Sequence, residues 1–485
     1  MNASDSSAVC VPKHITPENA SDQAILCGGA PPEFCGLRML SDISFDTEIR
    51  NKLTTLSLSR PNYWSYSAST TRTCALDYFQ YPAMMVPDML SDLMRIICAA
   101  DPNVRTVFDP FVGSGSVQTE TMLLGLDFVG SDINPLAVLL CKAKAGPFRP
   151  NQLEEKLDDV LSFAESDESS RREATFAGLT KWFDPRTIYE LSRLRRAVRA
   201  EPMLWARRFF WVALAETVRR TSNSRTSTFK LHIRTPKDIA SRDLSPITVF
   251  EEVATENICL LDEQLTALDQ QSLLTRRRYQ GSIEVYLRSA TCAAAKEQRF
   301  DLLVTSPPYG DNPTTVPYGQ HSYLPLQWID LSDIAPKLDA SCLSTTHEID
   351  RRSLGGSRKN AVKLSERVLC NSPTFRECLD ALQHEPPDRR SRAAAFIHDL
   401  DACIDPLLSH LRKNAYMVFV VGNRRIGGRQ LKTDKILGEL LGKRGAKHVC
   451  TIARTIPTKR MALKNNISAT MNRELILVFR NAGGK

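Results

Sequence analysis

The stretch that decides the fold is TVFDPFVGSG at residues 106–115, followed by DFVGSD at residues 127–132. Thr106–Asp109 is a short apolar run typical of a buried strand, and the residues after Gly115 follow a helical pattern as far as Leu124. Asp127–Asp132 indicates a second strand. A strand, a glycine turn, a helix and a second strand form a βαβ unit, so the sequence predicts an α/β sheet.

The glycine turn suits a backbone that touches a ligand. Gly113 and Gly115 lack the side chains that would block a close approach. Asp132 ends the second strand, where a carboxylate can accept hydrogen bonds from two ribose hydroxyls. These features indicate an adenosine-type ligand. NAD is an alternative, although the turn lacks the third glycine of the dinucleotide motif and nothing downstream suggests a hydride acceptor.

The rest of the chain alternates between strand-like and helical regions. Further strand patterns occur at residues 282–287, 300–304, 415–421, 447–456 and 474–479. Residues 390–414 predict a helix, after a stretch without a clear pattern. We therefore predict four regions: a loosely ordered N-terminal arm at 1–60, a first core part at 61–148, a helical insertion at 149–281 and a second core part at 282–485.

Composition limits the class of protein. Lys and Arg number 63 against 55 Asp and Glu, a formal net charge of +8 that permits a polyanionic partner without requiring one. The sequence has no secretory signal and no run of about 18 apolar residues, which predicts a cytoplasmic protein without a membrane partner. Its 13 cysteines include no CxxC pair, so we expect free thiols and no metal site.

A second motif, DLLVTSPPY at residues 301–309, carries the chemistry. A buried strand delivers two prolines and an aromatic ring at its carboxyl end, where open α/β sheets bind ligands. Pro307 and Pro308 fix φ and lack an N–H, which makes the loop rigid. Ser306 and the Pro307 carbonyl can accept hydrogen bonds from an amino group, and Tyr309 offers a ring on which a flipped base can stack. A proline-stiffened turn around a core tyrosine is the structural alternative.

These motifs resemble those of a known family. FDPFVGSGS, GSDINP and DLLVTSPPY resemble the first, second and fourth motifs of the DNA amino-methyltransferases, and YPAMMVP resembles their cofactor-closing motif. SLGG, VVGNR and the residues that follow Tyr309 resemble a subgroup of bacterial site-specific DNA methyltransferases. The likeness spans residues 79–141 and 283–479. It implies an S-adenosylmethionine-dependent methyltransferase fold, Rossmann-like with a mixed seven-stranded sheet, and S-adenosyl-L-methionine as cofactor.

The resemblance also implies roles by position. Ser306, Pro307, Pro308 and Tyr309 would hold the target amine. Asp132 would hold the ribose, Asn134 would lie beside the adenine, and the turn at 81–83 would close over the methionine moiety. The implied cofactor-binding residues are Tyr81, Pro82, Ala83, Asp109, Pro110, Phe111, Gly113, Ser114, Gly115, Asp132, Asn134, Ser289 and Thr305. The third motif usually carries a Gly-Asp pair, but the sequence here reads Leu287-Arg288-Ser289-Ala290, which leaves the adenine contacts open.

The implied reaction is methyl transfer to an exocyclic amine of a base flipped out of double-stranded DNA. Serine before the two prolines is typical of N4-cytosine modification, whereas aspartate is commoner for adenine, so N6-adenine methylation is an alternative. RNA guanine-N2 methylation on the same fold and a non-enzymatic methyltransferase-like subunit are others. Methylation of a cytosine ring carbon needs a cysteine nucleophile, typically in a Pro-Cys pair that this sequence lacks.

Candidate DNA contacts lie in three segments: the helical insertion, the Arg-rich stretch at residues 350–363 and the loop at residues 458–464. Residues 219–230, at the end of the insertion, mix cations with hydroxyls, the side chains that contact phosphates. Residues 458–464 are also basic. Arg225, Lys230, Lys459 and Arg460 are the candidates, against the alternative of a solvated surface. A restriction endonuclease of a restriction-modification system is expected as a functional partner.

Overall fold

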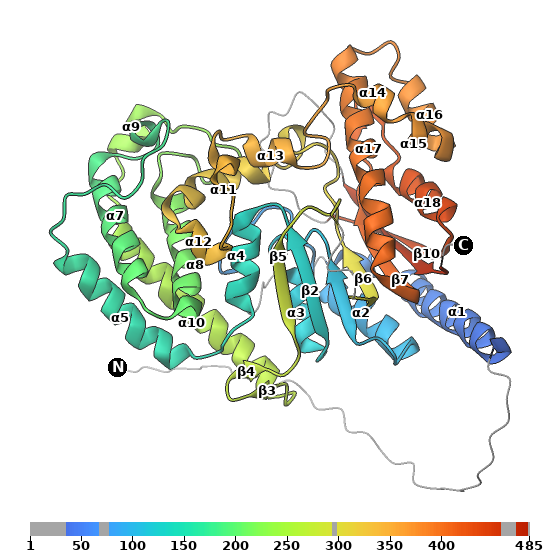
Figure 1. Cartoon of the computed structure of the whole chain (residues 1–485), viewed down its shortest axis with the longest axis horizontal. Coiled ribbons are helices and arrows are strands. Elements are labelled where there is room, and N and C mark those ends of the chain that lie inside the picture. Colours follow the sequence, from blue (N-terminus) through green and yellow to red (C-terminus); the bar gives the residue numbers. More distant parts are fainter. Residues whose placement is uncertain (1–34, 67–76, 293–297, 457–471, 484–485) are drawn as a thin grey trace, which may run out of the picture. The chain divides into compact units, whose positions relative to one another are not determined.

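A computed structural model describes residues 35–66, 77–292, 298–456 and 472–483 (Figure 1). Residues 43–485 form one compact unit. Within this unit, helices cover both faces of a central sheet.

Seven strands form one mixed sheet in the order β10-β11-β7-β6-β1-β2-β5. The five strands from β7 to β5 pair in parallel, whereas β11 is antiparallel to both β7 and β10. The sheet confirms the predicted α/β architecture. Its strands are β1 Thr106–Asp109, β2 Asp127–Asp132, β5 Ile283–Leu287, β6 Phe300–Thr305, β7 Leu411–Val421, β10 Ala446–Thr455 and β11 Arg473–Asn481.

Alternate side chains along the strands enter two different cores, because successive strand residues point to opposite faces of a sheet. Val304 and Val418 pack in the core shared with helices α2, α3 and α4, whereas Leu303 and Met417 pack in the core under α17 and α18. These helices are α2 Pro87–Ala100, α3 Ser116–Leu123, α4 Pro135–Lys144, α17 Pro387–Ser409 and α18 Thr433–Lys443.

A block of helices separates α4 from β5 in sequence and lies beside α4 (Figure 1, green). Its centre is α8, where Phe210 and Trp211 are fully buried. The helices are α5 Pro150–Ser166, α6 Leu179–Trp182, α7 Pro185–Ala200, α8 Leu204–Thr221, α9 Pro236–Ala240 and α10 Pro246–Asp269, followed by the hairpin of β3 Leu274–Thr275 and β4 Arg278–Tyr279. The region is helical, and its exact domain boundaries stay a prediction.

Further short helices lie between β6 and β7. They are α11 Tyr318–Trp328, α12 Leu331–Ile334, α13 Glu348–Arg352, α14 Ala361–Leu364, α15 Glu366–Asn371 and α16 Pro373–Asp380, with 3-10 turns at Asn312–Thr314 and Ala340–Leu343. A hairpin of β8 Arg425–Ile426 and β9 Arg429–Gln430 follows β7. Within the described ranges, no helix combines the length and apolar character needed to cross a bilayer.

The prediction of a loosely ordered N-terminal arm is wrong for the second part of that arm. Helix α1 runs from Cys35 to Ser59, and a 3-10 turn follows at Tyr63–Ser65. Ile49 and Leu53 are fully buried in the core of the compact unit. These two apolar residues are four apart, on one face of the helix, but the other apolar residues of α1 are spread around it, so the weak pattern concealed a packed element. Residues 1–34 lie outside the described residues.

Candidate active site

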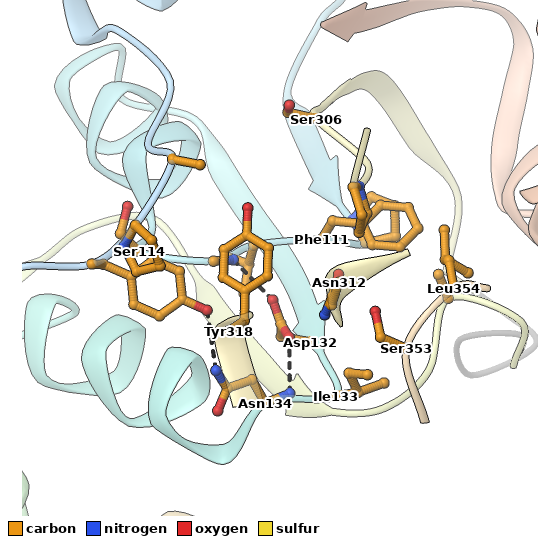
Figure 2. A pocket seen from close by; sticks show the side chains of 18 of the residues that line it. Phe111, Ser114, Asp132, Ile133, Asn134, Ser306, Asn312, Tyr318, Ser353 and Leu354 are labelled. Carbon is orange, nitrogen blue, oxygen red and sulfur yellow. Dashed lines mark hydrogen bonds between the residues drawn. The ribbon is translucent and has the colours of Figure 1, made fainter. Parts of the chain in front are cut away.

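A cavity of about 870 Å³, counting its open mouth, lies where strands β1, β2, β5 and β6 end at their carboxyl edge. This is the edge at which open α/β sheets bind ligands. The cavity brings together most of the predicted cofactor residues and part of the predicted catalytic loop (Figure 2). Those that line it are Tyr81, Pro82, Ala83, Pro110, Phe111, Gly113, Ser114, Asp132, Asn134, Ser289, Ser306 and Pro308.

The glycine turn after β1 forms the floor of this cavity. Gly113 has a φ of 50°, in the left-handed region that glycine adopts without strain. Its amide N–H donates to Asp132 Oδ2 at 3.0 Å, which ties the turn to the end of β2. Behind the turn, the buried Lys144 Nζ donates to the Ser114 carbonyl at 2.6 Å, and burial lowers the pKa of Lys144 to about 8.

Asp132 presents a carboxylate at the tip of β2. Its Oδ1 accepts a hydrogen bond from the Asn134 backbone N–H at 2.8 Å. Burial raises the pKa of Asp132 to about 6, although the backbone donors around the carboxylate oppose that rise. A ligand with hydroxyl donors would offset the cost of burying this charge.

Asp109, at the end of β1, lies behind the cavity lining. Its Oδ1 accepts hydrogen bonds from Thr305 Oγ1 at 2.6 Å and from the Phe111 backbone N–H at 3.0 Å. Its Oδ2 is buried and has no hydrogen-bond partner among the described residues. Burial raises the pKa of Asp109 to about 7. A cationic ligand group nearby would stabilise the ionised form.

The side chain of Asn134 forms hydrogen bonds with other residues of the protein. Its Nδ2 donates to Tyr81 Oη at 3.2 Å and to Ser322 Oγ at 2.8 Å, while its Oδ1 accepts from the Leu136 N–H and caps α4. The Tyr81 ring also stacks on that of Tyr318, with centroids 5.8 Å apart. Asn134 therefore holds Tyr81 in place, and its contact with an adenine ring stays a prediction.

The loop after β6 is fixed by its own polar groups. Ser306 Oγ donates to the Val420 carbonyl at 3.1 Å and lies 3.3 Å from the Tyr309 hydroxyl. Tyr309 does not line the cavity. Its hydroxyl donates to Glu474 Oε1 at 3.1 Å, and burial holds its pKa well above the usual value, so it remains a donor. Asp109, Gly115, Thr305 and Pro307 likewise lie outside the lining.

Several lining residues had no assigned role in the sequence analysis. They are Asn312, Tyr318, Ile349, Arg352, Ser353 and Leu354. All come from the segment between β6 and β7, which carries no clear periodicity. The available signal was the resemblance of the residues after Tyr309 and of the SLGG stretch to the same family.

Only two of the four predicted DNA-contact residues lie in the part of the chain that the structure describes. Arg225 and Lys230 are exposed and flank Phe229, whose ring packs edge-on against that of His321. Lys459 and Arg460 lie outside the described residues. Within the described ranges, no group of three or more His, Cys, Asp or Glu side chains could hold a metal ion.

Comparison with known proteins decides the family. The chain is 30% identical, over 455 residues, to the type II methyltransferase M.MvaI of Kocuria varians, with 90% of this chain and 97% of that protein covered. The chain belongs to the type II methyltransferase family. No protein-family model matches this chain. The rRNA methyltransferase aviRa of Streptomyces viridochromogenes aligns with 86% of this chain and 96% of its own, at 10% identity and a TM-score of 0.30.

Proposed function

We propose that this methyltransferase transfers a methyl group from S-adenosyl-L-methionine to an exocyclic amine of a flipped-out base in double-stranded DNA, most specifically N4 of cytosine. The observation that carries the proposal is the position of Ser306. It lies on the wall of the same cavity that holds the glycine turn and Asp132. A hydrogen-bond acceptor for an amine and the residues that suit an adenosine-type cofactor therefore line the same cavity.

The residues of the cavity fit this cofactor. Gly113 carries no side chain, which leaves its backbone open to the ligand, and its φ of 50° favours glycine. The Asp132 carboxylate suits the ribose hydroxyls, and the unpartnered Asp109 Oδ2 suits a cationic amino group behind the turn. When bound, S-adenosyl-L-methionine supplies an electrophilic methyl group on sulfur.

Catalysis on this proposal consists of orientation and electrostatic support. An aryl amine shares its lone pair with the ring, and acceptors at its two hydrogens favour a pyramidal nitrogen whose lone pair is free to react. Ser306 Oγ and the Pro307 carbonyl would supply these acceptors. Because Ser306 Oγ donates its own proton to the Val420 carbonyl, its lone pairs remain available. The positioned amine then needs no covalent enzyme intermediate.

The choice of base rests on the serine before the two prolines, which favours cytosine over adenine. N6-adenine in DNA and N2-guanine in RNA are the other amines that the same geometry would accept. The link to DNA rests on the family and on the exposed cations Arg225 and Lys230. A cytoplasmic location and a restriction endonuclease as functional partner belong to the same proposal.

One experiment separates these amines. The full chain is incubated with tritiated S-adenosyl-L-methionine and separate pools of double-stranded DNA and RNA, and the labelled nucleoside is identified by mass spectrometry. We expect N4-methyldeoxycytidine from DNA only, and no label with the Ser306→Ala control. Label found only in RNA would overturn the substrate class, and N6-methyldeoxyadenosine would overturn the base.

The functional partner has its own test. Plasmid DNA from cells that express the protein is challenged with a panel of restriction endonucleases. Protection at one recognition sequence is expected, and it should be lost with Ser306→Ala. If every enzyme cleaves plasmid from cells with the wild-type protein as readily as plasmid from cells with Ser306→Ala, that result would count against a role in site protection.

A further inference from the structure

The adenine end of the cavity lacks the acid that the third motif usually supplies. The chain after β5 reads Leu287-Arg288-Ser289-Ala290, and Ser289 is the only hydroxyl in that run. The Ser289 Oγ lies 2.8 Å from Thr291 Oγ1 and accepts from the Thr291 N–H at 3.3 Å, so it is already engaged. Another part of the fold can therefore supply an acceptor for the adenine amine.

Asn312 offers such an acceptor. It lines the cavity, its side chain is 2% exposed, and its Oδ1 has no hydrogen-bond partner among the described residues. A buried carbonyl oxygen without a partner is unfavourable, and such atoms in native proteins often await a ligand or a water molecule. We propose that Asn312 Oδ1 accepts a hydrogen bond from the 6-amino group of the cofactor's adenine, which rests on the proposed use of S-adenosyl-L-methionine.

The orientation of the Asn312 amide is fixed by Asp350. Asn312 Nδ2 donates to Asp350 Oδ1 at 3.1 Å. The same carboxylate accepts the backbone N–H groups of Gly319 at 2.7 Å and Gln320 at 3.2 Å. A flipped amide would point its oxygen at a carboxylate, which cannot donate to it. The amide nitrogen must therefore face Asp350, and the oxygen is left for another donor.

The loop that carries Asn312 is anchored on its other side as well. The neighbouring Asp311 is buried, and its Oδ1 forms an ion pair with Arg424 at 2.6 Å. Thr314 Oγ1 also donates to this carboxylate at 2.8 Å. Contacts on both sides hold Asn312 in one position, so its acceptor is preorganised for a ligand donor.

The position of Asn312 within the cavity favours the cofactor's adenine, and not the target base, as its hydrogen-bond donor. In Figure 2, Asn312 is drawn toward the end that holds Asp132, Ile133 and Ser353, whereas Ser306 lies at the opposite end. The target amine belongs at Ser306, and the ribose hydroxyls belong at Asp132. The remaining N–H donor of the cofactor on the Asp132 side is the adenine 6-amino group.

The test compares two product analogues by calorimetry with the full chain. S-adenosylhomocysteine has the 6-amino donor, whereas S-inosylhomocysteine has a carbonyl there. We expect the wild type to bind the amino compound about tenfold or more tightly, since the carbonyl would oppose Asn312 Oδ1. Asn312→Ala should lower that preference to about threefold or less, and the matched control Asn103→Ala, at an exposed asparagine outside the cavity lining, should keep it.

Each outcome bears on the inference. Equal binding of both compounds by the wild type overturns it without any variant, so a variant that fails to fold leaves the test intact. An unchanged preference in Asn312→Ala also overturns it, and a higher KM for DNA in a separate methylation assay of that variant would then assign Asn312 to the target base. The calorimetric measurement contains no nucleic acid, so a failure of the proposed DNA specificity leaves it untouched.

Discussion

The Tyr309 hydroxyl donates a hydrogen bond to Glu474 Oε1 at 3.1 Å, and this contact joins the loop after β6 to strand β11. Glu474 is in turn held by Arg454 on β10, whose Nε lies 2.8 Å from Oε2. The loop after β6 is therefore attached to the antiparallel edge of the sheet, and its hydrogen bond to Glu474 gives the Tyr309 hydroxyl a structural role. The ring remains the part proposed to stack on the target base.

Two substitutions separate these roles of Tyr309. Tyr309→Phe keeps the ring and removes the hydroxyl, so we expect a fall in single-turnover methylation of about threefold to tenfold. Tyr309→Ala also removes the stacking surface, worth ~1–3 kcal/mol per base, and should lower the rate roughly tenfold to a hundredfold. Affinity for S-adenosylhomocysteine should stay near normal in both. Equal rates for the two variants would remove the stacking role.

Ser306→Ala tests the amine acceptor. We expect turnover to fall more than DNA affinity does, because the acceptor matters most when the amine becomes pyramidal. The Val420 carbonyl also loses a donor, so a loss of stability of about 1 kcal/mol should accompany it. Thermal melts beside single-turnover assays separate the effects. A variant that melts early yet methylates normally per folded molecule would end the catalytic assignment.

Asp132→Ala tests the ribose contact. A charged acceptor shared by two hydroxyls is worth ~1.5–3 kcal/mol, so calorimetry should show S-adenosylhomocysteine affinity lower by about tenfold to a hundredfold. Asp127→Ala is the matched control, because Asp127 lies at the start of the same strand and its carboxylate accepts from the Ser282 N–H. Unchanged affinity in Asp132→Ala would mean that another residue binds the ribose.

The raised pKa of Asp109 predicts a pH dependence. Below pH about 7 its carboxyl is protonated and cannot pair with a cationic amino group, so S-adenosylhomocysteine affinity should fall as pH drops through that value. Asp109→Asn should flatten the profile between pH about 6.5 and 8. Calorimetry across that range is the measurement. A wild-type profile without this slope would show that no charge of Asp109 is used in binding.

The raised pKa of Asp109 makes the stability of the ligand-free protein depend on pH in the opposite direction from its ligand affinity. Since the folded pKa of Asp109 lies above its ordinary value, the ligand-free protein should lose stability as pH rises from about 4 through 7. Melting temperatures of wild type and Asp109→Asn over this range provide the check. Parallel curves would contradict the assignment of that pH dependence to Asp109.

Arg225 and Lys230 are predicted to contact phosphates. The double variant Arg225→Ala/Lys230→Ala should bind DNA more weakly, with the salt slope of its affinity reduced by about two. Lys413→Ala/Lys443→Ala removes the same charge from a separate groove near the start of β7, and it should leave binding nearly unchanged. Fluorescence anisotropy at several salt concentrations gives both slopes. Equal losses in the two double variants would indicate only a net-charge effect.

The sequence by itself determined the sheet and the centre of the site. Strands β1, β2 and β6 are short apolar runs, and their carboxyl ends must meet at one edge when such strands pair in parallel. Gly113 lies in the turn after β1, Asp132 ends β2, and Ser306 directly follows β6. The local patterns therefore predict the three strand ends, and the family resemblance predicts that they share one site.

Tertiary structure alone decided the elements whose local pattern is weak. Helix α1 becomes ordered because Ile49 and Leu53 pack into a distant core, and the segment between β6 and β7 forms short helices around buried groups. Asn312 belongs to this segment. The orientation of its amide depends on Asp350, and Asn134 is turned inward by Tyr81 and Ser322. Such roles depend on partners far along the chain, which no local periodicity encodes.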